Sequence, residues 1–383
     1  MNKFFSVIWI KNNFSFFQRI IELFGLIFIY QLFEHDLLLT FGFFGFFNVL
    51  HGVSVIPFSM FIGKVGTQRA IGIAAIVFAF STSFIFLYQH TEDTTYIFCW
   101  FLCFIIAKLL FYTALTYYIT TYTEHENRGS QISYDHMIQM IVIITAPILG
   151  GYLSEFYGIG GVMLVGSVIL LLLFIPLSQL PNRQYKLNYI FLEEIKENKR
   201  LVYFTFLTEY SNEVEKIWAL FLFILLGSSY TLVGNFLGIS TAVSFVCIYF
   251  LGKLLDSYNR VTSLKLLMVL VAVLRVIRLS FESIFPLSIV ESITKVFENL
   301  RFQTVQTITY DLVEENLERK SVHENIITKE MWVNIGRGMG LFSSAVIAHF
   351  FGFKMAITVM ALSALWIFFF KPSTSKMSLS LGA

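Results

Sequence analysis

Ionisable side chains recur inside stretches of this sequence that are otherwise apolar. Glu209, Glu213 and Lys216 follow an i, i+4, i+7 spacing, so a helix places all three on one face. Glu215 points away from that face. An apolar surrounding tolerates such groups only where they pair, face a wet cavity or take part in binding. The spacing therefore predicts a face that binds a solute or an ion, with structural salt bridges as the alternative for each residue.

A second apolar stretch, at 284–307, repeats this arrangement with a lysine between two glutamates. Two further stretches contribute an Arg–Glu pair and a lone Lys. The complete candidate set for solute binding or coupling is Arg19, Glu22, Lys108, Glu209, Glu213, Lys216, Glu291, Lys295, Glu298 and Arg301. Its basic and acidic groups are equal in number, so the set can neutralise itself when empty. This balance indicates either a polar or zwitterionic solute that breaks internal pairs, or a network whose pairs switch during a working cycle.

Glu213 has a further candidate role within this set. It lies near the middle of its apolar stretch, where burial disfavours the charged form of a carboxyl. We therefore expect it to be a candidate proton carrier. A stable pair with Lys216 would instead keep it ionised.

Several other polar residues lie near the predicted helix ends, where gating or contacts between helices suit them better than central binding. This second tier consists of Asp135, His136, Glu330 and Arg337. We expect Arg275 and Arg278 to extend their charged groups toward the surface, or to pair with Glu282.

The sequence lacks a convincing enzymatic motif. EENLER, from Glu314 to Arg319, matches the E-E-x-x-x-R pattern of intramembrane proteases, but it lies in a hydrophilic loop and no suitable histidine motif follows. The sequence has no Walker-type phosphate loop. Cys99, Cys103 and Cys247 all lie in apolar stretches, where thiols behave as small hydrophobic groups. We therefore expect no catalytic residue, no metal and no cofactor.

The composition assigns these helices to a membrane. Of the 383 residues, 56% are hydrophobic and only 14% are charged, whereas a soluble domain has about 25% charged residues. A net charge of +2 gives no reason to expect nucleic acid as a partner. The sequence is therefore predicted to be an all-α polytopic membrane protein whose partners are a small-molecule solute and membrane lipid.

A spanning helix needs roughly 20 mostly apolar residues, and by that measure the chain contains about twelve candidates. We predict two six-helix halves, 1–181 and 201–383, joined by a cytoplasmic linker at 182–200 whose end forms a short amphipathic helix. The segment from Leu201 to Leu226 is the doubtful span. The predicted spans are 15–33, 37–62, 70–88, 96–118, 131–157, 159–177, 201–226, 230–251, 262–281, 284–307, 326–351 and 353–370.

Basic residues concentrate in alternate loops and acidic residues in the opposite ones. Because cytoplasmic loops carry the excess of Lys and Arg, both termini are predicted to be cytoplasmic. The N-terminal stretch lacks a signal-peptide pattern, since Lys11 and two asparagines interrupt its apolar run. Compact loops favour a bacterial cytoplasmic (inner) membrane.

The two predicted halves repeat each other. GKVGTQR, from Gly63 to Arg69, separates spans two and three, and GKLLDSYNR, from Gly252 to Arg260, separates spans eight and nine. PILGGYLSEFYG at 147–158 likewise has a counterpart in SSAVIAHFFG at 343–352. Short glycine-containing loops let two helix ends approach closely, which suits a gating loop.

Gly252, Asp256 and Arg260 resemble the G-x-x-x-D-x-x-G-R loop of the major facilitator superfamily, with an asparagine where a glycine is usual. Gly63 and Arg69 are the first-half counterparts, in a shorter copy that lacks the aspartate. The resemblance covers essentially the whole chain. It implies that spans one, four, seven and ten line a central cavity, and those spans carry the candidate set.

The resemblance implies a monomeric secondary active transporter that works by alternating access, with proton or sodium coupling, as a symporter or antiporter. Transport of a small polar or charged solute is the first reading. A drug or metabolite exporter of the same fold is the alternative within transport. A membrane receptor or scaffold without transport is the alternative outside it.

Overall fold

The computed structural model describes residues 3–122, 128–187, 189, 191–255, 260–315 and 322–370, and within these ranges the regular structure is entirely helical. The helices are α1 (Lys3–Leu32), α2 (Leu37–Val65), α3 (Thr67–Thr91), α4 (Thr95–Tyr122), α5 (Arg128–Leu172), α6 (Phe174–Leu177), α7 (Phe191–Glu197), α8 (Lys199–Asn212), α9 (Val214–Leu225), α10 (Tyr230–Leu255), α11 (Arg260–Ile277), η1 (Arg278–Ser280), α12 (Ile284–Glu315), α13 (Val322–Phe351), α14 (Phe353–Ser363) and η2 (Ala364–Phe369). The predicted all-α class is confirmed.

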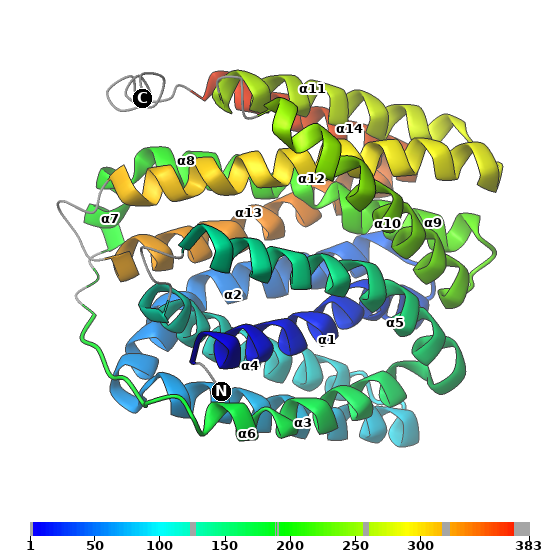
Figure 1. Cartoon of the computed structure of the whole chain (residues 1–383). Coiled ribbons are helices and arrows are strands. Elements are labelled where there is room, and N and C mark those ends of the chain that lie inside the picture. The colour runs from blue at the N-terminus through cyan, green and yellow to red at the C-terminus, as the bar shows by residue number, and fades with distance from the viewer. Residues whose placement is uncertain are drawn as a thin grey trace.

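The long helices lie roughly side by side along one direction (Figure 1). The segment at 178–198 lies at one end of the bundle, which we call the linker end. The turns at 33–36, 226–229 and 352 lie at the other end, which we call the far end. Helices α1 to α6 precede the linker, and the helices from α8 to η2 follow it.

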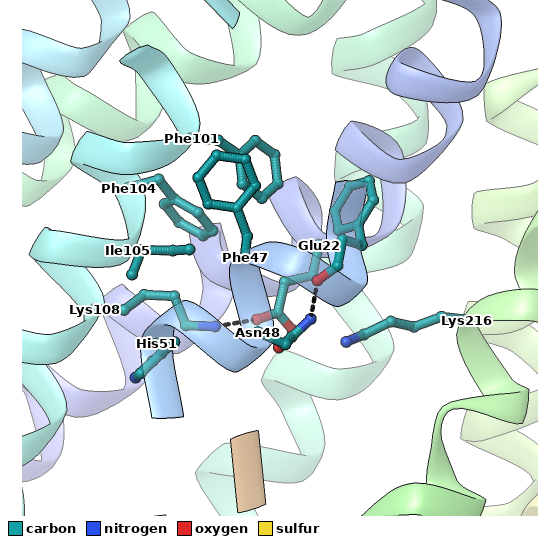
Figure 2. A pocket seen from close by; sticks show the side chains of 10 residues that line it. Glu22, Phe47, Asn48, His51, Phe101, Phe104, Ile105, Lys108 and Lys216 are labelled. Atoms are coloured by element: carbon teal, nitrogen blue, oxygen red, sulfur yellow. Dashed lines mark hydrogen bonds and ion pairs between the residues drawn. The ribbon is translucent and has the colours of Figure 1, made fainter. Parts of the chain in front are cut away.

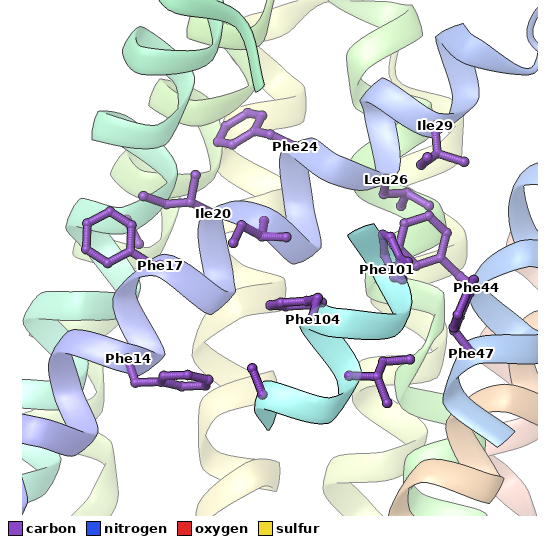
Figure 3. Close-up of a cluster of buried hydrophobic side chains, with 14 of the residues drawn as sticks. Phe14, Phe17, Ile20, Phe24, Leu26, Ile29, Phe44, Phe47, Phe101 and Phe104 are labelled. Carbon is purple, nitrogen blue, oxygen red and sulfur yellow. The ribbon is translucent and has the colours of Figure 1, made fainter. Parts of the chain in front are cut away.

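The core begins on α1, whose phenylalanines point in different directions (Figure 3). Phe14 points toward α4, whereas Phe17 and Phe24 point away from it and lie against Gly166 and Gly150 of α5. Phe14 stacks on Phe111 with ring centroids 3.7 Å apart. The helix is longer than the predicted span of 15–33, since it begins at Lys3. Polar residues within the first turns are compatible with the helix since Lys11 pairs with Asp135.

Two glycines interrupt the bundle at equivalent places before and after the linker. Gly158, with φ +63°, kinks α5 at the far end. Gly352, with φ +86°, separates α13 from α14 at the same end. Residues with a Cβ rarely adopt positive φ, so each glycine permits a sharp reversal. Both lie where the sequence repeats predicted a break between neighbouring spans.

The doubtful seventh span is helical over its whole length but discontinuous. Helix α8 ends at Asn212 and α9 begins at Val214, with Glu213 at the junction. Ahead of the break, α8 is weakly apolar, and beyond it α9 is strongly so. Glu213 itself keeps right-handed helical backbone angles (φ −65°, ψ −13°), and its side chain is buried in the site described below.

Helices from either side of the linker cross at glycines. A Cβ added to Gly234 of α10 would lie 2.2 Å from the carbonyl oxygen of Pro147 on α5. A Cβ added to Gly338 of α13 would lie 2.8 Å from the carbonyl oxygen of Gly45 on α2. Small residues of this kind let helix backbones approach closely in membranes. The α2–α13 and α5–α10 crossings therefore hold the two groups of helices together.

The linker fastens the turn between α2 and α3. Asn182 accepts hydrogen bonds from the backbone N–H groups of Gln68 (3.1 Å) and Arg69 (3.4 Å), and its amide donates to the carbonyl of Val65 (3.1 Å). It thus caps a helix whose own N-cap residue, Gly66, has no side chain. Gly63 is also needed here, since a Cβ there would lie 2.5 Å from the carbonyl oxygen of Tyr185.

The surface of the bundle suits a hydrocarbon surrounding. Large apolar side chains are widely exposed, among them Phe156 at 73% and Phe285 at 77%. Six of the described helices are long and apolar enough to span a membrane: Lys3–Leu32, Leu37–Val65, Thr67–Thr91, Thr95–Ile119, Met137–Leu177 and Tyr230–Cys247. Helices α12 and α13 are long enough, but polar and charged residues interrupt their apolar runs.

We predict that Asn182→Ala lowers the free energy of unfolding by about 1 kcal/mol, the usual worth of a helix cap. The measurement is thermal or denaturant unfolding of the purified protein in detergent. Gln184→Ala is the matched control, because Gln184 also bonds this turn, through the carbonyl of Lys64, but is exposed. Equal destabilisation by the two changes would contradict the role of Asn182 as the cap of α3.

Candidate functional site

Helices α1 and α4 share a buried ion pair. Lys108 Nζ lies 2.6 Å from Glu22 Oε1 (Figure 2). Gln18 Nε2 donates to the same carboxylate at 2.7 Å, and the hydroxyl of Tyr112 donates to Gln18 Oε1. The carboxylate of Glu22 is thereby held in one orientation by a cation and an amide.

A cavity of about 20 Å³ adjoins this pair, which is room for about one water. Glu22, Asn48, His51 and Lys108 form its polar part, with phenylalanines of α2 and α4 on the other side (Figure 2). Lys216 of α9 also reaches the cavity. Side chains from before and after the linker therefore meet at one small polar space.

The helices after the linker supply a second set of pairs beside this cavity. Arg337 Nε of α13 lies 2.8 Å from Glu209 Oε2 and 3.8 Å from Glu213 Oε1. Lys216 Nζ lies 2.9 Å from Glu213 Oε2. We call the group of Arg19, Glu22, Lys108, Glu209, Glu213, Lys216 and Arg337 the central cluster.

Arg337 was expected near a helix end, but it lies at the middle of α13, where it contacts the candidate residues of the seventh span. The sequence signal for this was present, because Arg337 lies more than ten residues from either end of the predicted span 326–351. The three candidate residues expected on one face of the seventh span, Glu209, Glu213 and Lys216, do come together, with the helix break between them.

Arg19 differs from the other members of the central cluster. Its side chain is solvent-exposed, although protein surrounds it and Glu22, Tyr112 and Arg337 are its electrostatic neighbours. Within the described ranges, it makes no ion pair and no hydrogen bond. The central cluster thus holds four basic and three acidic side chains, and the guanidinium of Arg19 is exposed without an ionic partner among the described residues.

A second charged group is enclosed by α9, α11, η1 and α12. We call it the α12 cluster, and its members are Glu215, Arg275, Arg278, Glu291, Lys295 and Glu298. Arg275 Nε lies 2.9 Å from Glu298 Oε1 and 3.2 Å from Glu215 Oε1. Lys295 Nζ lies 2.5 Å from Glu215 Oε2 and 2.8 Å from Glu298 Oε2. Three acids and three bases neutralise one another here.

The two arginines of the α12 cluster do not lie where the sequence predicted. Arg275 and Arg278 were expected to reach the surface or pair with Glu282, yet both are fully buried (0% exposed). Arg278 bonds Glu215 (3.0 Å) and Glu291 (3.2 Å), and its guanidinium lies 3.9 Å from the centroid of the Trp218 ring. The predicted surface position of Arg278 is wrong because these three partners compensate its buried charge inside the bundle.

Glu215 is the site residue that the sequence analysis left out. As expected, it points away from the face of Glu213 and Lys216, but there it meets the charged residues of the α12 cluster. The sequence indicated it only by its position two residues after Glu213. Helical spacing assigned it to another face without showing what lies opposite that face.

Arg301 lies between the two clusters. It bonds the side-chain oxygen of Asn212, and Glu209, Glu215, Arg275 and Glu298 are its electrostatic neighbours. Two other candidates lie apart from both clusters: Asp135 pairs with Lys11 near the linker end, and Glu330 Oε1 lies 3.4 Å from Lys329 Nζ. Asp256 and the side chains of His136 and Arg260 lie outside the described residues, as does the surrounding of Gly252. Arg69 is exposed at the linker end.

The chemistry available in the two clusters is ionic. The central cluster has a cation without a partner and lies between helices from both sides of the linker, so it can bind a charged or polar group. The α12 cluster lies within one group of helices and is internally balanced. No group of three or more His, Cys, Asp or Glu that could hold a metal occurs in the described part of the chain.

The sequence matches a protein-family model, and the fold matches solved structures. The family model of the Major Facilitator Superfamily matches residues 13–225. The crystal structure of the nucleoside transporter NupG is similar over 100% of both chains, with a TM-score of 0.70 at 12% identity. A bacterial homologue of the human lysosomal transporter Spinster, inward-facing and occupied, has a TM-score of 0.70 at 12% identity over 96% of this chain and 95% of its own. The E. coli fucose:proton symporter FucP has a TM-score of 0.60 at 12% identity over 96% of each chain. No curated protein matches the sequence.

We predict that Glu291→Ala destabilises the protein by about 3 to 5 kcal/mol, because it leaves the buried guanidinium of Arg278 with less compensation. Thermal unfolding in detergent measures the effect. Glu282→Ala is the control, since Glu282 is mostly exposed and only weakly paired. The double change of Glu291 to Gln and Arg278 to Met should recover part of the loss. Full stability of Glu291→Ala would show that the α12 cluster contributes little to the fold.

Proposed function

This chain belongs to the major facilitator superfamily, and we propose that it is a secondary active transporter that moves a small polar or charged solute by alternating access. The two moving bodies would be the halves 1–181 and 201–383, with 182–200 as their linker. The protein would act without enzymatic activity of its own.

The central cluster is the observation that carries this proposal. Glu22 and Lys108 belong to helices before the linker, whereas Lys216 and Arg337 belong to helices after it. Lys216 already lines the same cavity as the Glu22–Lys108 pair. Relative motion of the two halves would therefore change the distances between these ionic partners, which is how a solute can be coupled to the conformation.

Exchange of partners within the central cluster supplies a working cycle. In the present arrangement Glu22 forms an ion pair with Lys108, and Glu213 forms an ion pair with Lys216. A solute that takes over one of these partners releases the other charge, and the released charge then favours the alternative position of its half. A buried charge without a partner is costly. A conformation in which the halves have separated these partners and no solute has replaced them would therefore be disfavoured.

Glu213 is the carboxylate that we propose for proton coupling. It is 3% exposed and stands at the junction of α8 and α9. One of its oxygens, Oε2, has a charged neighbour in Lys216 but no hydrogen bond of good geometry. Protonation of Glu213 would weaken its hold on Lys216 and Arg337 together. Sodium coupling is the alternative, and either ion would accompany the solute.

We further propose that the linker end faces the cytoplasm of a bacterium and that the protein acts as a monomer in the inner membrane. The linker end carries Lys64, Arg69 and Arg183, whereas Glu34 and Asp93 lie at the far end. Excess Lys and Arg on the cytoplasmic side supports this orientation.

The test is solute uptake by the purified protein in liposomes, with counterflow screened over sugars, nucleosides, amino acids, organic acids and cationic drugs. We predict that Glu213→Gln and Lys216→Ala each lower the initial rate of uptake at least tenfold, because each removes a partner from the central cluster. Lys354→Ala is the control, since Lys354 is a largely exposed lysine at the far end.

Three outcomes would contradict the proposal in different ways. Unchanged uptake in both variants would remove the central cluster from the transport pathway. Uptake of hydrophobic cations alone, insensitive to both changes, would favour the drug or metabolite exporter. Saturable binding without any flux in the wild type would favour a membrane receptor.

A further inference from the structure

We propose that the transported solute is an organic anion whose charged group binds Arg19 and whose apolar body lies in a groove between α1 and α5. This inference rests on the proposed transport function and narrows its solute class. The carboxylate or phosphate of such a solute would occupy the internal space beside α1, and the apolar body would point toward the linker end.

Arg19 provides the anion-binding group. It is exposed, with no ion pair or hydrogen bond to any residue that the structure describes, whereas the other cations of the central cluster, Lys108, Lys216 and Arg337, lie against carboxylates. A guanidinium can donate two parallel hydrogen bonds to a carboxylate or phosphate. A neutral or cationic solute would leave this positive charge uncompensated.

The groove provides the apolar part of the site. Its volume is about 560 Å³, and Phe5, Ile8, Trp9 and Phe16 of α1 face Val142 of α5 across it. This size falls within the range of small-molecule sites, which are mostly apolar with few polar groups. Trp9 is 60% exposed, so its ring is available to a bound molecule.

One polar atom in the groove lacks a partner. Asn12 lines the groove and is 5% exposed. Its Nδ2 donates to the carbonyl of Ile8 at 2.9 Å, but its Oδ1 is buried without a hydrogen bond in the described structure. Buried polar atoms are normally satisfied. This oxygen is enclosed by protein, so a ligand in the groove would reach it only after a local rearrangement of Asn12.

Helix geometry joins the groove to Arg19. Asn12, Phe16 and Arg19 follow an i, i+4, i+7 spacing and therefore share one face of α1. At a rise of 1.5 Å per residue, Arg19 lies about 10 Å along the axis from Asn12. Phe14 and Phe24 point in other directions from α1, where each packs into the core (Figure 3). One face of α1 thus presents an apolar surface that ends in a free cation.

Quenching of Trp9 tests the location and chemistry of binding together. The probe is a medium-chain carboxylate with bromine on its terminal carbon, added to the wild type in detergent. We expect saturable quenching of tryptophan fluorescence. Trp9→Phe should lose most of the quenching, because the other tryptophans lie outside the groove.

Changes at Arg19 test the charge requirement. Arg19→Gln should weaken apparent affinity at least tenfold, and Arg19→Lys should recover part of it because the positive charge is kept. The methyl ester of the probe should bind the wild type no better than the acid binds Arg19→Gln. Melting temperatures of the variants are measured in parallel, and the Lys variant serves as the folded comparison if the Gln variant is unstable.

Four results would overturn the inference. These are equal affinity for acid and ester, full affinity in Arg19→Gln, undiminished quenching in Trp9→Phe, and quenching that rises without saturation, as when the probe only partitions into detergent or lipid. Uptake in liposomes separates this inference from the proposed function. Saturable, Arg19-dependent binding without uptake would support the anion site and contradict transport. Uptake of other solutes without carboxylate binding would support transport and contradict the anion site.

Discussion

The ion pairs inside the bundle are the constraint on which the rest of the structure depends. A charge removed from water is stable only when the protein returns an opposite charge or hydrogen bonds to it, and the cost of failure is several kcal/mol. The two clusters meet this requirement differently. The α12 cluster closes on itself with three acids and three bases within one group of helices. The central cluster is completed only where helices from both sides of the linker meet.

This difference also separates the candidate residues into two groups with different surroundings. Glu291, Lys295 and Glu298 were candidates for solute binding, and they now share their buried environment with two arginines that already compensate them. Their main effect is to fix α9, α11 and α12 relative to one another. The central cluster depends on how the two groups of helices sit, and its excess of one positive charge at Arg19 leaves it able to accept an anionic group.

The helix crossings set the geometry of the central cluster. Close approach at Gly234 and Gly338 brings backbones into contact, so side chains farther along the same helices meet across the bundle. Lys216 reaches the cavity of Glu22, while Glu209 lies beside Arg337. Glu213, at the junction of α8 and α9, contacts both Lys216 and Arg337.

The sequence by itself determined the membrane-type composition, the helical class, the breaks at Gly158 and Gly352, and the face shared by Glu209, Glu213 and Lys216. These are local properties, because hydropathy, glycine positions and helical spacing depend on residues close together in the chain. Only the tertiary structure decided that Arg275 and Arg278 are buried, that Glu215 faces Lys295, that Asn182 caps α3 and that Arg19 has no partner among the described residues. Each of these depends on which side chain lies opposite, and the partners are distant in sequence: 80 residues for Glu215 and Lys295, and 114 for Asn182 and Gln68. Helical periodicity specifies the face of a residue, but only packing specifies the neighbour of that face.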